Sequence, residues 1–150
     1  MLEATEVTIT LESDTGEFVS EIERSLLASL GSAAPRGDYA PIAVLARDKG
    51  GALLGGLIGS TSYGWLLIKM LWVTEAARGC GLGTRLMATA EAAALARGCH
   101  GAWLDTSSGR ARGFYEGLGY QPFGALENAV GEHPEGHRRS FLRKRLNPRP

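Results

Sequence analysis

Residues 71–84, which read Leu71-Trp72-Val73-Thr74-Glu75-Ala76-Ala77-Arg78-Gly79-Cys80-Gly81-Leu82-Gly83-Thr84, join an apolar run to a glycine-rich segment. The run over 65–73 predicts a strand, and apolar residues at helical spacing over 81–97 predict a helix. The first amides of a helix lack internal partners, and the helix dipole favours an anion beside them. Glycines let the backbone approach that anion closely, and Arg78 adds a permanent cation. We therefore predict a phosphate-binding loop over 78–84.

Two better-known phosphate loops do not fit this stretch. A dinucleotide fingerprint, G-x-G-x-x-G, that starts at Gly79 and Gly81 would need its third glycine at Thr84. A P-loop, G-x-x-x-x-G-K, does not occur in the chain. What remains is R-x-x-G-x-G between a strand and a helix. The alternative is a glycine-rich turn ahead of an ordinary helix.

A second motif, Phe114-Tyr115-Glu116-Gly117-Leu118-Gly119-Tyr120, follows about thirty residues downstream of the loop, after one more predicted strand. With both motifs in this order, the chain resembles the GCN5-related N-acetyltransferase (GNAT) superfamily. The resemblance covers nearly the whole chain in its order of elements and is most specific over 73–83 and 114–120. The segment 136–146 also resembles a small bacterial branch of that superfamily.

The resemblance implies an acyl-CoA-dependent N-acyltransferase with the GNAT α/β fold. It implies that the strand matching 65–73 splays from its neighbour, that acetyl-CoA binds along this strand and the loop, and that Tyr115 protonates the departing thiolate. The implied coenzyme-binding residues are Leu71, Trp72, Val73, Arg78, Gly79, Cys80, Gly81, Leu82, Gly83 and Thr84.

Two features depart from the family pattern. Many relatives carry Asn or Gln ahead of the Phe-Tyr pair, where this chain has Ser107-Ser108-Gly109-Arg110-Ala111. Some relatives carry a carboxylate base on the strand matching 65–73, where the one charged residue here is Lys69.

The remaining elements follow from local patterns. Alternation over 6–11 predicts a first strand, and Asp14 with Glu17 resembles a capping box for a helix over 16–30. We expect a loop over 31–38, a hairpin turn over 48–51, strands over 42–46, 52–60, 100–104, 120–126 and 139–146, and a short helix over 110–118. Together they predict one domain over 1–150, with a mixed, mostly antiparallel sheet and helices on both faces.

Composition limits the classes of function. The chain has 150 residues, 44% of them hydrophobic and 21% charged, with a formal net charge of +0. This balance is that of a soluble globular protein and gives no indication of a nucleic-acid partner. The apolar segment 51–73 is interrupted by a turn-like cluster at 60–64, which favours two strands over a membrane span.

The start of the chain lacks the features of a secretory signal, and two cysteines make no disulfide framework, so we expect a cytoplasmic protein. His100 and His133 lack metal-ligand spacing, so we expect no metal.

Charge is unevenly distributed along the sequence. Residues 1–30 contain seven carboxylates against Arg24 alone. Solvated faces are the default explanation. In the resembled family the first helix borders the acceptor, so Glu21 and Glu23 are candidates for attracting a cationic amine. His137 is a candidate base because imidazole titrates near neutrality.

We therefore expect transfer of an acetyl or longer acyl group from acetyl-CoA to a primary amine of a small molecule or peptide, with no nucleic acid and no membrane as partner. Two alternatives stay open, a non-catalytic module that binds acyl-CoA and a nucleotide-binding protein that uses the same loop. The sequence identifies neither the base nor the acceptor, and it leaves a homodimer open.

Overall fold

The computed structural model describes residues 6–30 and 39–146. The chain forms two compact units, Met1–Arg36 and Gly37–Pro150. The loop expected over 31–38 lies outside the described residues.

The first unit contains the helix α1 (Gly16–Leu30), with the bounds predicted from the sequence. Asp14 Oδ1 accepts a hydrogen bond of 3.0 Å from the amide of Gly16, which satisfies one donor at the helix start. The strand expected over 6–11 is wrong, because these residues form no strand. Alternation makes a strand only where a neighbouring strand completes the hydrogen bonds, and the described residues of the first unit contain no strand.

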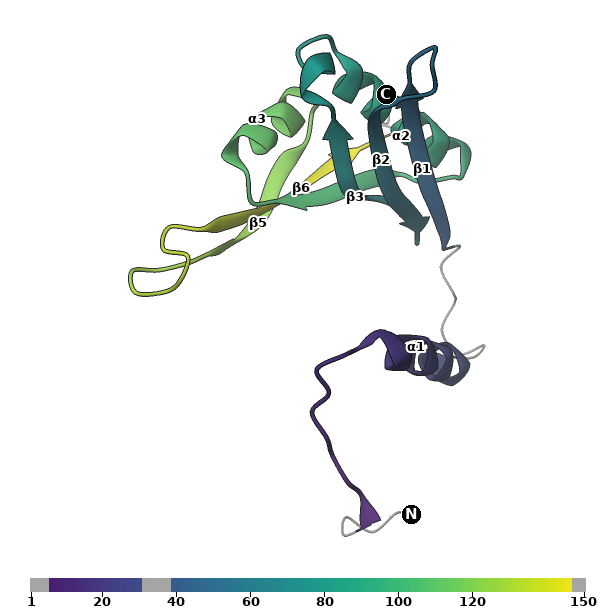
Figure 1. Cartoon of the computed structure of the whole chain (residues 1–150), viewed down its shortest axis with the longest axis vertical. Coiled ribbons are helices and arrows are strands. Elements are labelled where there is room, and N and C mark those ends of the chain that lie inside the picture. Colours follow the sequence, from purple (N-terminus) through teal and green to yellow (C-terminus); the bar gives the residue numbers. More distant parts are fainter. Residues whose placement is uncertain (1–5, 31–38, 147–150) are drawn as a thin grey trace. The chain divides into compact units, whose positions relative to one another are not determined.

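The second unit is built on a six-stranded sheet with the order β1-β2-β3-β4-β6-β5 (Figure 1). Every neighbouring pair is antiparallel except β3 and β4, which confirms the mixed, mostly antiparallel sheet. The strands are β1 (Ala40–Arg47), β2 (Leu53–Ser62), β3 (Trp65–Val73), β4 (Gly101–Thr106), β5 (Gln121–Glu127) and β6 (Arg138–Arg145).

Two longer helices and one short one complete the second unit. The 3-10 helix η2 (Glu75–Ala77) and the helix α2 (Leu82–Ala96) follow β3, and α3 (Gly109–Gly117) follows β4. Helix α2 packs on β1, β2 and β3, whereas α3 packs on β4. Large side chains fill the core between these layers; the fully buried ones are Leu57, Leu66, Met87, Leu104, Tyr120 and Leu142.

Two tight turns connect the first three strands, as the sequence predicts. Asp48 Oδ1 accepts hydrogen bonds of 2.9 Å from the amides of Gly50 and Ala52, which fixes the turn between β1 and β2. The apolar segment 51–73 is divided between β2 and β3, so two strands occupy it. Within the described ranges, no helix is long and apolar enough to cross a membrane.

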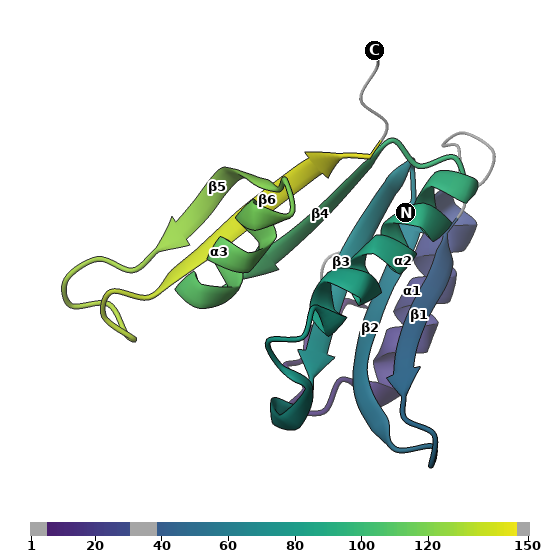
Figure 2. The same ribbon diagram turned by 90° about the horizontal axis from the view of Figure 1, so that it is seen from above.

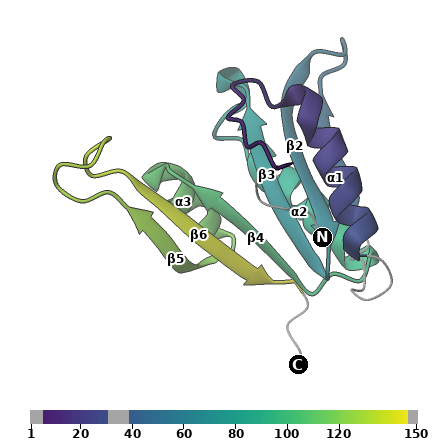
Figure 3. The same ribbon diagram turned by 90° about the horizontal axis from the view of Figure 1, so that it is seen from below.

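The sheet divides into two halves that separate at one end. Strands β3 and β4 pair only at Trp65–Gly101, Leu66–Ala102 and Leu67–Trp103, although both continue well beyond these positions. Figures 2 and 3 show the two strands close together at one end and apart at the other. We call β1-β2-β3 with α2 the first half and β4-β6-β5 with α3 the second half. The separation between them is the splay that the family resemblance implied.

Candidate active site

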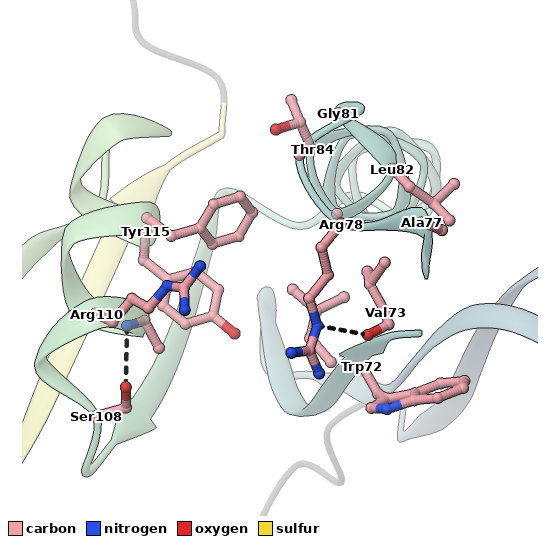
Figure 4. Close-up of a pocket in the computed structure, with 15 residues that line it drawn as sticks. Trp72, Val73, Ala77, Arg78, Gly81, Leu82, Thr84, Ser108, Arg110 and Tyr115 are labelled. Atoms are coloured by element: carbon pink, nitrogen blue, oxygen red, sulfur yellow. Dashed lines mark hydrogen bonds between the residues drawn. The ribbon is translucent and has the colours of Figure 1, made fainter. Parts of the chain in front are cut away.

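A cleft of about 610 Å³ lies where the two halves separate (Figure 4). The first wall of the cleft comes from the end of β3, the loop after it and the start of α2. The second wall comes from the start of α3 and the segment before it. The lining residues are Leu71, Trp72, Val73, Ala77, Arg78, Gly79, Gly81, Leu82, Gly83, Thr84, Ser108, Arg110, Ala111, Phe114 and Tyr115.

The end of β3 presents unpaired backbone groups to the cleft. The amide of Thr74 donates to the carbonyl of Leu54 at 2.8 Å, so the polar groups of Thr74 face β2. In an antiparallel pair the polar groups of successive residues point alternately toward and away from the partner strand. Those of Val73 and Leu71 therefore face away from β2, on the side where the pairing with β4 has already ended at Leu67.

A β-bulge produces this orientation. Ile58 pairs with Met70 and Gly59 pairs with Ile68, so Lys69 is an extra residue in β3. One extra residue in a strand reverses which of the following peptide groups face the neighbour. No feature of the local sequence around Lys69 predicted this bulge.

The glycine-rich loop has the conformation that an anion site requires. Gly79 and Gly81 have φ of 81° and 82°, a region that favours glycine, and a Cβ at either position would meet no atom within 4 Å. Gly81 is the N-cap of α2, and the first amide to bond back to it is that of Arg85. The amides at 82–84 therefore lack helical partners and border the cleft. The loop therefore has the conformation of a phosphate-binding site.

Two arginines make the cleft cationic. Arg78 Nε donates to the carbonyl of Val73 at 3.1 Å, which orients its guanidinium beside the end of β3. Arg110 lies on the opposite wall, at the start of α3 (Figure 4). None of the lining residues is acidic. Both features favour an anionic ligand.

Tyr115 stands on the second wall. Its side chain is 9% exposed, and its hydroxyl is directed into the space between the walls (Figure 4). Burial raises the pKa of Tyr115 above its ordinary value of 10.0, so the hydroxyl keeps its proton at neutral pH. Phe114, the next residue, also lines the cleft, and a Cβ on Gly83 would lie 3.3 Å from its ring. Gly83 therefore allows α2 to approach α3 closely.

Four of the predicted site residues lie outside the lining. Cys80 is exposed, and its Sγ donates to the carbonyl of Ala77 at 2.7 Å. Glu21 and Glu23 are exposed on α1, in the first unit. His137 lies just before β6, with its Nε2 3.3 Å from Ser107 Oγ.

The structure adds residues that sequence reasoning did not assign to the site. Ser108 and Arg110 line the cleft. They lie in the stretch ahead of the Phe-Tyr pair, where the family pattern has Asn or Gln and this chain has neither. Ser108 Oγ accepts from the amide of Ala111 at 3.1 Å and caps α3. A Ser three residues before Ala111 at a predicted helix start could have indicated this cap.

No group of three or more His, Cys, Asp or Glu side chains that could hold a metal occurs in the described part of the chain.

The sequence matches known proteins over most of its length. The model of the acetyltransferase (GNAT) family matches residues 10–120. An acetyltransferase of Agrobacterium fabrum is 37% identical over 109 residues, which cover 73% of this chain and 77% of that protein. The blasticidin-S acetyltransferase of Streptomyces morookaense is 41% identical over 97 residues, 64% of this chain and 68% of that protein.

Solved structures share the fold. An acetyltransferase of Bacillus cereus superposes with a TM-score of 0.75 at 26% identity, over 95% of this chain and 99% of that one. An aminoglycoside 6'-N-acetyltransferase solved with coenzyme A superposes with a TM-score of 0.64 at 22% identity, over 90% of this chain and 85% of that one.

Proposed function

Since the chain belongs to the GNAT acetyltransferase family, we propose that it transfers an acetyl group from acetyl-CoA to a primary amine of a small molecule. The observation that carries this proposal is a single cleft with three complementary parts. It combines a phosphate loop, an unpaired strand edge and a buried tyrosine hydroxyl.

The proposed binding of the donor, acetyl-CoA, depends on the first wall of the cleft. The loop amides and Arg78 would hold the diphosphate, and the unpaired backbone groups of Leu71 and the amide of Val73 would hold the extended arm of the coenzyme. Arg110 adds a cation from the second wall. The aminoglycoside acetyltransferase with the same fold was solved with coenzyme A, which supports this choice of donor.

When bound, acetyl-CoA supplies an activated thioester. The unpaired amides of Leu71 and Val73 would polarise its carbonyl, because donors fixed in place stabilise the charge that develops on the oxygen. Tyr115 would protonate the leaving sulfur, for which a buried and protonated phenol is suited. The attacking amine must lose a proton, and we propose Glu21, Glu23 or His137 as groups that take it through water.

The acceptor class rests on two relatives. One is named for blasticidin S and the other for aminoglycosides, so a small molecule is favoured over a peptide. The acidic side chains of α1 would favour a cationic amine.

We propose one acetyltransferase domain over 1–150, since the family match runs from residue 10 to residue 120 and so includes parts of both compact units. We propose a cytoplasmic location, since the chain has only two cysteines, no disulfide framework and an acetyl-CoA donor.

The test is release of free thiol from acetyl-CoA in the presence of single amines. The panel contains blasticidin S, an aminoglycoside, polyamines, free amino acids and a peptide, and mass spectrometry identifies the acetylated amine. Calorimetry measures coenzyme A affinity in parallel. Binding of coenzyme A without thiol release from any amine would favour the non-catalytic binding module, and competition by ATP alone would favour a nucleotide-binding protein.

A further inference from the structure

The groups proposed to bind the donor and the group proposed to protonate it belong to different halves of the sheet. Leu71, Val73 and the glycine loop are in the first half, and Tyr115 is in the second. The backbone ladder joins these halves at only three residue pairs, far from the open end of the cleft. The distance between a bound thioester and Tyr115 therefore depends on whatever else ties the halves together.

One ion pair crosses between the halves. Lys144 Nζ on β6 lies 2.5 Å from Glu91 Oε1 on α2, and the two side chains are 27% and 12% exposed. Among the described residues, the other three ion pairs each stay within the second half: Arg112–Glu116, Arg138–Glu127 and Arg139–Asp105. A largely buried pair has a defined geometry, unlike an exposed one, because water does not compete for its charges.

Tyr120 connects this ion pair to Tyr115. Lys144 Nζ lies 5.6 Å from the centroid of the Tyr120 ring, and that ring lies 6.0 Å from the ring of Tyr115 at an angle of 67°. Tyr120 is 1% exposed, and its hydroxyl has no hydrogen-bond partner within the described residues. Burial and the neighbouring Glu91 carboxylate raise the pKa of Tyr120, so the ring stays neutral.

We propose that Glu91, Lys144 and Tyr120 are positioning residues that hold Tyr115 at a fixed distance from the donor-binding wall. The inference rests on the proposed function, because it assumes that Tyr115 acts on a donor held by the first half. The ion pair fixes α2 relative to β6, and the Tyr120 ring transmits that position to Tyr115.

This arrangement predicts a separation of two kinetic effects. Glu91→Gln and Lys144→Met leave the loop and the β3 edge intact, so coenzyme A affinity should change by less than about 3-fold. They release the second wall, so kcat should fall by about 10- to 100-fold, as small displacements of a catalytic group do. Arg138→Gln, which breaks the exposed pair with Glu127, is the matched control and should change neither quantity.

A charge exchange tests the link itself. Glu91→Lys with Lys144→Glu restores an ion pair of reversed polarity and should recover kcat to within several-fold of wild type. If the substitutions only destabilised the core, the amount of folded protein would fall, but kcat per folded molecule would stay constant. All rates are therefore referred to the folded fraction measured by circular dichroism.

A second pair of variants decides the matter if the ion-pair variants do not fold. Tyr120→Phe keeps the ring and should keep kcat, whereas Tyr120→Leu removes the ring and should lower kcat at constant coenzyme A affinity. Wild-type kcat in folded Glu91→Gln or in folded Tyr120→Leu would overturn the inference, and so would a parallel loss of affinity. If Tyr115→Phe also keeps wild-type kcat, the proposed acid is wrong instead. If Tyr115→Phe lowers kcat while the positioning variants do not, only the present inference fails.

Discussion

The two walls of the cleft use different chemistry. The first wall offers the backbone: an unpaired strand edge, two glycines with positive φ and the first amides of α2. The second wall offers side chains: the hydroxyl of Tyr115, the ring of Phe114 and the guanidinium of Arg110. The first wall would suit any extended ligand with a diphosphate, because backbone groups recognise shape and charge. On the second wall, the hydroxyl of Tyr115 is the group that would distinguish a catalyst from a binding module.

The difference between the walls can be tested by damaging one at a time. Substitutions in the first wall should change affinity for coenzyme A, and substitution of Tyr115 in the second wall should change turnover. Arg110 is the exception on the second wall, because its charge would act on the bound donor. Any variant that changes both quantities equally would contradict this division.

The largest effect is expected from Tyr115→Phe, which keeps the ring and removes the proton. We expect kcat to fall by about 10²–10⁴-fold with unchanged coenzyme A affinity, the usual range for loss of a general acid. Because burial raises the pKa of Tyr115, the wild-type enzyme should lose its acid only above about pH 10. A pH profile of kcat measures this loss of activity at high pH. Unchanged kcat in the variant would make Tyr115 a core aromatic.

The next effect is expected from Gly83→Asp in the first wall. The new carboxylate would meet the phosphate site and crowd the Phe114 ring, so the Kd for coenzyme A should rise by about 10- to 100-fold, or about 1.4–2.7 kcal/mol. Gly113→Asp is the matched control. It adds the same charge to an exposed site on α3 with no atom near its Cβ. Calorimetry measures the Kd for coenzyme A of both variants. Equal Kd values for the two would remove the main support for the phosphate loop.

A smaller effect is expected from Arg110→Ala, since a partly solvated cation contributes modestly. The Kd for coenzyme A should rise by about 3- to 10-fold, and the affinity should depend less on salt. Arg145→Ala, at an exposed position on β6 away from the cleft, is the control. An Arg110 variant with wild-type affinity and salt dependence would show that the second wall contributes no charge to donor binding.

The smallest effect is expected from Tyr120→Phe, which removes a buried hydroxyl without a partner. We expect the variant to be about 1 kcal/mol more stable than the wild type at pH 7, because a buried unsatisfied group is costly. The raised pKa of Tyr120 gives the pH dependence its sign. The unfolded chain ionises first, at about pH 10, so wild-type stability falls as pH rises above that value. Urea unfolding at pH 7 and pH 11 should show a smaller fall in the free energy of unfolding for the variant than for the wild type.

The first wall could be predicted from the sequence because its chemistry is local. The glycines, Arg78 and the start of α2 lie within one short stretch, and their conformation follows from residue type. The prediction also included Cys80, which the loop turns out to direct toward the carbonyl of Ala77. Most helix and strand bounds in the second unit were likewise correct to within a few residues.

The second wall was less predictable because its contacts are long-range. Tyr115 entered through a family motif, whereas Ser108 and Arg110 reach the cleft only because α3 starts opposite the loop. The prediction of a strand over 6–11 was wrong for a related reason. Its alternating pattern was present, but a strand also needs a neighbour that no local pattern specifies.

The extra residue at Lys69 gives β3 a phase that exists only while the bulge exists. If β3 kept its length but paired without the bulge, Lys69 would lie opposite Ile58, the peptide groups of Leu71 and Val73 would turn toward β2, and that of Trp72 would turn toward the cleft. Every lining residue would still be present in the sequence, yet the strand would offer the wrong alternate edge. Deletion of Lys69 would instead keep Met70 opposite Ile58 and keep Leu71 facing the cleft, so this strand should tolerate the loss of its extra residue better than a one-residue slip of its pairing.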